Sequence, residues 1–290
     1  MGKSVDPVLK NSHVDITPTV EAFEIAAANA IVAIITAAIR ERNGCLIALS
    51  GGNTPRGVYR RLGSMLVSQS MDVSRLQLIF SDERMVAQDD PNSNYGMAKE
   101  NLLSRISIPP SHVHRIKGEI KAEAAAREYE RELQKLFLLF AGRCDLILLG
   151  VGEDGHTASL FPESSILRER DKSVRALFIP RLSSWRVTLT LPFINQARAV
   201  VFLASGRAKA TMVAKILATS ESREDIPATL VRPHPGTVAW MLDAEAASQI
   251  PTAKTSDSSS TISERAPADS SARNTHVTQN GIRNGNDENN

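Results

Sequence analysis

Short, nearly continuous apolar runs recur along the chain between residues 45 and 243. Four of them are CLIALS (45–50), LQLIFSD (76–82), CDLILLGVG (144–152) and AVVFLAS (199–205). Such runs, bounded by Gly, Ser or Asp, are typical of parallel strands that are covered on both faces. Three further strand candidates are enriched in β-branched and aromatic residues: VRALFIP (174–180), RVTLTL (186–191) and TVAWMLD (237–243).

Segments with a helical pattern lie between these runs. We expect helices over 17–42, 54–65, 122–140 and 206–219. The first two begin with Thr followed by Pro, because Thr can cap a helix and Pro suits its first position. This alternation predicts an α/β fold with an open, mostly parallel, doubly wound sheet and helices on both faces.

The two ends of the chain differ in composition from its centre. From about Ile250 onward the sequence is rich in Ser, Asn, Asp and Thr and nearly lacks bulky apolar residues. Such a segment buries too little surface to offset the entropy lost on ordering. We therefore expect a single α/β domain over 17–249, a disordered polar tail over 250–290 and a loosely ordered lead-in over 1–16.

Composition and charge narrow the class of protein. The formal net charge of +2 argues against a nucleic-acid-binding module, which normally carries a concentrated basic face. The longest apolar stretch, 25–39, is short for a membrane span and contains Asn29 and Thr36, so a buried Ala-rich helix fits better. Two cysteines, Cys45 and Cys144, are too few for a disulfide framework and suggest buried thiols in a reducing compartment. We expect a soluble, cytoplasmic protein.

Ligands of such a sheet bind beyond the carboxyl ends of its strands, so the residues that follow each strand are the first candidates for a site. The first strand is followed by Gly51, Gly52, Asn53 and Thr54. Two glycines allow a tight turn and a close approach to a ligand, and the next helix points its free N–H groups at it. This pattern predicts a phosphate or carboxylate site, although an ordinary strand–turn–helix connection would read the same way. It is not a Walker A loop, because no Gly-Lys-Ser/Thr follows.

Charged residues follow two other strands. Asp82 and Arg84 lie at the end of the 76–82 run, where they could orient sugar hydroxyls or a neighbouring basic group, or form a surface ion pair. Lys209 follows the 199–205 run in a second glycine-containing turn, and Arg186 opens another strand. Each alone is a common surface charge, but in the expected sheet they converge with the glycine turn on one anionic ligand.

The loop after the 144–152 run contains Gly150, Gly152 and Gly155, which match the G-x-G-x-x-G pattern of dinucleotide-binding folds. A nucleotide site also needs a long helix next, and Phe161-Pro162 ends that helix early. The nucleotide interpretation is therefore disfavoured.

The same loop places Asp154 two positions before His156, and a histidine there can exchange protons near neutral pH. Most other histidines read as structural or exposed. His112 and His114 have the spacing of two metal ligands, but no third ligand cluster supports them, so we expect no metal.

These segments together resemble the 6-phosphogluconolactonase family, most specifically in DGHTASLFP (154–162). The resemblance runs from about Leu46 to Ala247. It implies hydrolysis of 6-phospho-D-glucono-1,5-lactone without metal or cofactor, in the sheet architecture of sugar-phosphate isomerases and deaminases. Two positions depart from the family pattern: Ala87 replaces a common Pro, and Glu163 replaces a common Gly.

The resemblance and the chemistry of a δ-lactone suggest roles for the candidates. We expect His156 to act as general base on water, Asp154 to tune it or cap the loop, and Arg84 or a backbone N–H near Gly155 to stabilise the oxyanion. The expected substrate-binding residues are Gly51, Gly52, Asn53, Thr54, Asp82, Gly155, Arg186 and Lys209.

Two alternatives stay open. Glucosamine-6-phosphate deaminases share the Asp-Gly-His loop, but theirs continues toward an Asn-Glu-Pro, whereas this chain has Leu160-Phe161-Pro162 and no carboxylate. A non-catalytic sugar-phosphate sensor would use the binding residues but not His156.

The expected partner is a small phosphosugar lactone, with neither nucleic acid nor membrane, and the expected state is a monomer or weak homodimer.

Overall fold

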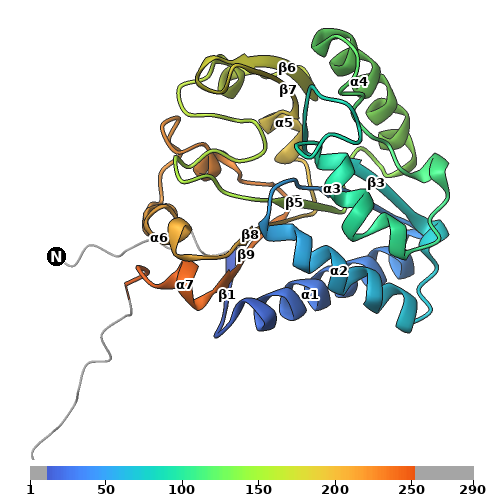
Figure 1. Cartoon of the computed structure of the whole chain (residues 1–290), viewed down its shortest axis with the longest axis horizontal. Helices are drawn as coiled ribbons and strands as arrows, with labels where there is room; N and C mark the ends of the chain where they lie inside the picture. The colour runs from blue at the N-terminus through green and yellow to red at the C-terminus, as the bar shows by residue number, and fades with distance from the viewer. Residues whose placement is uncertain (1–11, 252–290) are drawn as a thin grey trace, which may run out of the picture. The chain divides into compact units, whose positions relative to one another are not determined.

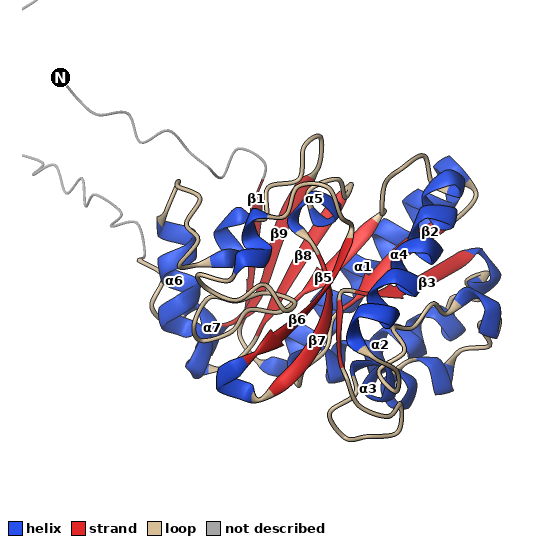
Figure 2. Ribbon diagram, turned by 90° about the horizontal axis from the view of Figure 1, so that it is seen from above, coloured by secondary structure: helices blue, strands red, loops and turns tan. Residues whose placement is uncertain are grey.

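A six-stranded parallel sheet forms the centre of the computed structural model, which describes residues 12–251. Its spatial order is β1-β9-β8-β5-β2-β3, and every neighbouring pair is parallel (Figure 2). The strands are β1 (Ser12–Thr17), β2 (Cys45–Leu49), β3 (Leu76–Phe80), β5 (Leu146–Leu149), β8 (Ala199–Ala204) and β9 (Thr237–Asp243). The expected parallel sheet is therefore confirmed.

Helices flank this sheet. In Figure 1, α1 (Val20–Arg42) and α2 (Thr54–Ser68) lie below it and contact each other, and α4 (Ala122–Leu139) lies above. The remaining helices are α3 (Asn94–Asn101), α5 (Leu191–Ile194), α6 (Ala210–Ala218) and α7 (Ala244–Ala247). The four expected helices are present, and the short α3, α5 and α7 were not expected.

A second, smaller sheet is antiparallel. It consists of β4 (Asp82–Arg84), β7 (Ser184–Leu189) and β6 (Val174–Ile179), in the order β4-β7-β6. The strand candidates over 174–180 and 186–191 are thus strands, but they form a hairpin outside the central sheet. Ser183, with φ 44°, takes the left-handed conformation that closes the hairpin.

The apolar stretch 25–39 lies within α1. Among the described residues, α1 is the one helix long and apolar enough to cross a membrane by length and composition. In this fold the helix packs on β1, β2 and β9. Its buried residues are Phe23, Ala27, Ala28, Ile31, Val32, Ile35 and Ala38. The Ala-rich stretch is thus a helix of the fold with one buried face, and Cys45 and Cys144 are buried free thiols, as expected.

The chain start differs from expectation. Residues 12–16, which we expected to belong to a loosely ordered lead-in, are part of β1, which pairs with β9 from Ser12↔Val238 to Thr17↔Asp243. An edge strand needs only its neighbour's free backbone groups, so six residues of mixed polarity give little sequence signal. Residues 1–11 and, from residue 252 onward, the expected tail over 250–290 lie outside the described residues.

The two expected Thr caps are also shifted. The α1 cap is Thr19 rather than Thr17, with its hydroxyl accepting a hydrogen bond from the Ala22 amide at 3.1 Å. Thr54 is already the first residue of α2, and no side chain caps that helix. The first N–H groups of α2 therefore stay available to a ligand.

Candidate active site

The strand order of the central sheet reverses between β2 and β5. From β2 the chain proceeds outward to β3, whereas β5, β8 and β9 proceed in the opposite direction. In parallel sheets, the loops at the carboxyl ends of two such strands separate and leave a crevice. The glycine turn after β2 and the histidine loop after β5 are these two loops.

A cavity of about 180 Å³ lies at this point. Eight of the expected site residues line it: Gly51, Gly52, Asn53, Thr54, Asp82, Arg84, His156 and Lys209. The other three lie behind its wall. Asp154 contacts His156, Gly155 lies between them in the chain, and Arg186 is opposite Arg84 in the β4–β7 ladder. The sequence-based site is thus one spatial cluster, with eight residues at its surface and three in support.

The glycine turn is held tightly. The buried Tyr59 hydroxyl of α2 donates to the Ser50 carbonyl oxygen and accepts from the Ser50 amide, each at 2.9 Å. A Cβ on Gly51 would lie 1.8 Å from the Asn94 side-chain oxygen, so this position excludes any other residue unless Asn94 moves. Gly52 has φ 95°, a conformation that side chains rarely adopt. The turn can therefore bring its backbone against a ligand at the start of α2.

Two buried carboxylates shape the loop after β3. Glu83 accepts hydrogen bonds from the backbone amides of Arg84, Asn94 and Tyr95 and from the Ser93 hydroxyl. Burial raises the pKa of Glu83 above its ordinary value, although these amide hydrogen bonds oppose the shift. Glu83 thus connects β4 to the start of α3.

Asp82 is engaged in the same way. Its Oδ1 accepts from the Asn94 amide at 2.9 Å, and its Oδ2 accepts from the Ser159 hydroxyl at 2.7 Å. The Arg84 guanidinium donates to the Asn92 carbonyl oxygen at 2.7 Å, so Asp82 does not orient it. Asp82 connects the loops after β3 and β5.

Sequence reasoning gave no role to Asn94, and it counted Glu83 only among three charges after the strand that could orient sugar hydroxyls or hold a basic residue. Ser93 is the N-cap of α3, with its hydroxyl accepting from the Gly96 amide at 3.0 Å, and this recognisable cap is the signal that could have placed Asn94 at a helix start. Two hydroxyls in the cavity wall were also missed. Ser50 Oγ and Ser81 Oγ are buried and have no hydrogen-bond partner among the described residues.

His156 and Asp154 form the polar pair of the β5 loop. His156 Nδ1 lies 2.5 Å from Asp154 Oδ1, and the His156 amide donates to the same oxygen at 3.1 Å. A carboxylate can only accept, so the proton is assigned to Nδ1, and Nε2 is left to accept a proton. A Cβ on Gly152 would lie 2.0 Å from Nδ1, so the glycine makes room for the ring.

The charge state of Asp154 fits this pairing. Burial pushes the pKa of Asp154 up, but the hydrogen bonds and charge of His156, together with the charge of Arg181, outweigh it and hold the pKa below its ordinary value of 3.8. Asp154 is therefore a carboxylate at neutral pH and stabilises a protonated His156.

Two cations that line the cavity, Arg84 and Lys209, and a third behind its wall, Arg186, have no carboxylate within ion-pair distance among residues 12–251. Arg186 is half-buried, and its Nε atom has no hydrogen-bond partner in this part of the chain. Burial, with the neighbouring charge of Arg84, lowers the pKa of Arg186. Cations kept without a partner are unfavourable unless an anion joins them.

Lys209 belongs to the 3-10 turn η7 (Arg207–Lys209). The buried Asp243 fixes the start of this turn by accepting from the Ser205 hydroxyl at 2.6 Å and from the Gly206 amide at 3.0 Å. Gly206 has φ 91°, which explains the glycine before the turn. Asp243 at the end of β9 therefore positions the Lys209 backbone at the cavity.

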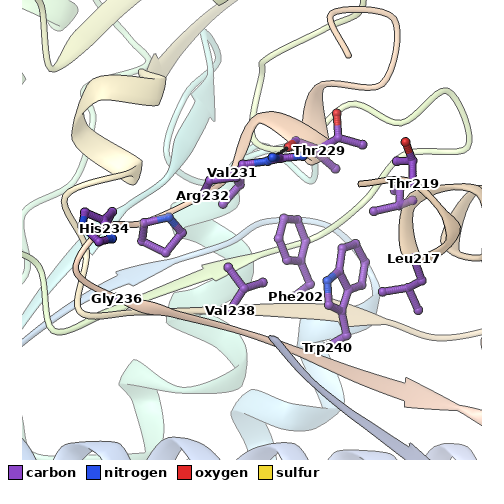
Figure 3. A pocket seen from close by; sticks show the side chains of 13 residues that line it. Phe202, Leu217, Thr219, Thr229, Val231, Arg232, His234, Gly236, Val238 and Trp240 are labelled. Carbon is purple, nitrogen blue, oxygen red and sulfur yellow. Dashed lines mark hydrogen bonds between the residues drawn. The ribbon is translucent and has the colours of Figure 1, made fainter. Parts of the chain in front are cut away.

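A second cavity, of about 320 Å³, lies against β8, β9 and the end of α6 (Figure 3). The rings of Phe202 and Trp240 stack along one side, with centroids 4.1 Å apart. No carboxylate lines this cavity, and the Arg232 guanidinium donates to the backbone carbonyl oxygens of Thr229 and Ser220. It lacks the histidine–carboxylate pair and the glycine turn of the first cavity, which is the candidate active site.

No group of three His, Cys, Asp or Glu side chains within residues 12–251 could hold a metal ion. The ring nitrogens of His114 contact Glu132 and Gln77, each at 2.7 Å. Through these contacts His114 connects α4 with β3, which is a structural role.

Comparisons with known proteins identify the family. A family model described as glucosamine-6-phosphate isomerases/6-phosphogluconolactonase matches residues 18–240. The 6-phosphogluconolactonase of Homo sapiens is 41% identical over 208 residues, which is 69% of this chain and 79% of that protein. The Synechocystis sp. 6-phosphogluconolactonase is 38% identical over 216 residues, 73% of this chain and 87% of its own.

The fold has the same relatives. A solved structure of 6-phosphogluconolactonase from Trypanosoma brucei superposes with a TM-score of 0.71 at 32% identity, covering 86% of this chain and all (100%) of that chain. These matches confirm the resemblance and the fold class expected from the motifs. The chain belongs to the glucosamine-6-phosphate isomerase/6-phosphogluconolactonase family.

Proposed function

We propose that this protein is a 6-phosphogluconolactonase, which hydrolyses 6-phospho-D-glucono-1,5-lactone to 6-phospho-D-gluconate in the second step of the oxidative pentose phosphate pathway. The curated relatives that carry this name support the activity. One structural observation carries the proposal: a histidine backed by a carboxylate shares a cavity with an unpaired lysine and a glycine turn.

In the proposed mechanism, Nε2 of neutral His156 takes a proton from water as the water oxygen bonds to C1. The imidazolium then returns this proton to the ring oxygen O5 as the C1–O5 bond breaks, and the new carboxylic acid releases its own proton. Asp154 keeps the proton on Nδ1 and stabilises the imidazolium. Arg84 or a backbone N–H near Gly155 stabilises the oxyanion.

The 6-phosphate lies, in this proposal, against the N-terminus of α2. Its ligands are Gly51, Gly52, Asn53 and Thr54, with the charges of Lys209 and Arg186. The uncapped first turn of α2 supports this place, because its N–H groups and the helix dipole favour an anion.

The sugar hydroxyls need partners as well. In this proposal Asp82 binds them: it lines the cavity, and each of its carboxylate oxygens accepts one hydrogen bond, from Asn94 or Ser159, which leaves further acceptor capacity.

Deamination of glucosamine 6-phosphate is the alternative activity within the family. It is disfavoured because Phe161 stands where the deaminase motif has its glutamate, and its ring lies 4.4 Å from the His156 ring, centroid to centroid. A sugar-phosphate sensor is disfavoured because binding alone has no use for the His156–Asp154 pair.

The test supplies the purified protein with fresh phosphogluconolactone and, separately, with glucosamine 6-phosphate. Acid release from the lactone above the spontaneous rate, with no ammonia from the amine, supports the proposal; the reverse result refutes it. His156→Ala should lower kcat by about two to four orders of magnitude, with thermal unfolding unchanged as evidence of folding. Near-normal turnover in this variant would remove His156 as the base.

The proposed setting is cytoplasmic, and the proposed state is a monomer or weak homodimer that contacts neither nucleic acid nor membrane. Light scattering during size-exclusion chromatography tests the oligomeric state. A stable higher oligomer at micromolar concentration would refute it.

A further inference from the structure

Arg181 reaches the histidine loop from the small antiparallel sheet. It lies in the 3-10 turn η6 (Pro180–Leu182), which joins β6 to β7. Its guanidinium Nη2 forms an ion pair with Asp154 Oδ2, whereas Asp154 Oδ1 contacts His156. The carboxylate of Asp154 is therefore held between a cation from one sheet and the imidazole that follows the other.

A second contact joins the same groups. The Arg181 guanidinium carbon lies 4.8 Å from the centroid of the Phe161 ring. The Phe161 ring also packs against the His156 ring, with centroids 4.4 Å apart and planes inclined by 31°. Arg181, Asp154, His156 and Phe161 thus form a closed ring of contacts, in which Arg181 touches both groups that touch the imidazole.

We propose that Arg181 is a positioning residue, which fixes the orientation of the His156 imidazole by holding the Asp154 carboxylate and the Phe161 ring. The proposal rests on the proposed function, in which His156 is the base. Arg181 does not line the cavity, so it acts through its two partners rather than on the substrate.

The two partners of this ion pair differ in solvent exposure. The Arg181 side chain is 54% exposed, whereas that of Asp154 is 28% exposed. Exposed ion pairs contribute little to folding, so removal of Arg181 should leave the fold intact. Removal of Arg181 should affect His156 more than it affects folding. The imidazole is held by the hydrogen bond to Asp154 and by the Phe161 ring, and it can turn when these two groups move.

The electrostatic effect has a defined sign. The charged groups around His156 are Asp154 and Arg181 on one side, and Asp82, Arg84 and Lys209 in the cavity wall. Without Arg181, the negative charge of Asp154 acts on His156 uncompensated and favours the protonated imidazole. The acidic limb of the pH profile of kcat/KM should then move to higher pH.

The experiment compares Arg181→Met, Arg181→Lys and the control Arg175→Met. Arg175 lies on β6 of the same hairpin, is 52% exposed and pairs with Glu169. In Arg181→Met, we expect kcat to fall about tenfold, KM to change less than about twofold, and the acidic limb to move up by about half a pH unit. Arg181→Lys keeps the positive charge, so the acidic limb should return to its wild-type pH. It should restore only part of kcat, because an ammonium lacks the planar face that the guanidinium presents to Phe161.

Two results would overturn the proposal. Unchanged kcat and pH profile in Arg181→Met would make the ion pair irrelevant to His156, and a raised KM with unchanged kcat would make Arg181 a substrate-binding residue. The control should match the wild type, and thermal unfolding establishes that each variant is folded.

One measurement separates this proposal from the proposed function. The titration of the His156 ring, followed by ¹H–¹⁵N NMR without substrate, needs no turnover. If the wild type lacks lactonase activity but Arg181→Met still moves the titration midpoint to higher pH, the function fails and the positioning role stands. If activity is present and the midpoint does not move, the positioning role fails alone.

Discussion

Replacing Gly51 with alanine is the sharpest test of how the cavity is built. The added Cβ would lie 1.8 Å from Asn94 Oδ1 and 2.1 Å from Asn94 Cγ, so the Asn94 side chain must leave its place. There its Nδ2 donates to the carbonyl oxygen and to the Oδ1 of Asp82, each at 2.9 Å, in a buried position. Both hydrogen bonds are lost when the side chain turns away.

The expected cost follows from these two bonds. A neutral hydrogen bond contributes about 1 kcal/mol to the free energy of unfolding, and one to a charged group about 1.5 to 3 kcal/mol. Gly51→Ala should therefore destabilise the protein by about 2.5 to 4 kcal/mol, or lower Tm by about 5 to 15 °C for a domain of this size. The displaced Asn94 amide also enters the space of the ligand, so kcat/KM should fall.

Urea denaturation of Gly51→Ala, Asn94→Ala and the double variant measures this coupling. Truncation of Asn94 removes the three atoms nearest to the new Cβ, so the double variant should be about as stable as Asn94→Ala. Gly150→Ala is the control, because a Cβ at Gly150 meets no atom within 4 Å and should change stability by less than about 0.5 kcal/mol. Additive costs in the double variant, or a Gly51→Ala protein as stable as the control, would refute the reasoning.

Three further variants test other parts of the structure. Lys209→Ala should raise KM for the lactone about tenfold or more, through loss of a charge-assisted hydrogen bond, with less effect on kcat and none in the surface control Lys215→Ala; steady-state kinetics decides. Glu163, at φ 59°, occupies the left-handed region, so Glu163→Gly should raise the free energy of unfolding by about 1 kcal/mol in urea, and a destabilised variant would contradict this. The hydrogen bond with His114 lowers the pKa of Glu132, against the opposing effect of burial. This stabilisation is complete above the ordinary value of 4.5 and is lost as pH falls through the lowered value. The stability difference between wild type and Glu132→Gln should therefore shrink as pH falls below 4.5.

The candidate site could be predicted from the sequence for two reasons. Buried parallel strands are recognisable as apolar runs, and their carboxyl ends lie at the same edge of the sheet. The runs 45–50, 76–82, 144–152 and 199–205 each became a central strand, and the polar residues after them line one cavity. Glu163 adds a detail of the same kind. It stands where the family often has glycine, and its positive φ is the reason a glycine suits this position.

The parts that were missed depend on contacts between residues far apart in the chain. Arg181 is an ordinary charge in a turn until the hairpin places it against Asp154, 27 residues earlier. Asn94 gains its role from Gly51, and β1 gains its structure from β9. The local sequence pattern indicates which residues are buried and where turns occur. The roles described here depend on partners that are distant in the sequence and become neighbours only in the tertiary structure.

The distribution of partners explains why this cavity favours an anion. The carboxylates Asp82, Glu83 and Asp243 each accept two or more hydrogen bonds from loop amides or hydroxyls, so their charge is used to hold the loops. Lys209 and Arg186, in contrast, have no carboxylate within ion-pair distance in the described part of the chain. The charges of these carboxylates are balanced by hydrogen-bond donors, whereas the charges of the two cations have no partner. The cavity therefore attracts anions. The carboxylates therefore define the shape of the site, and the cations define the charge of its ligand.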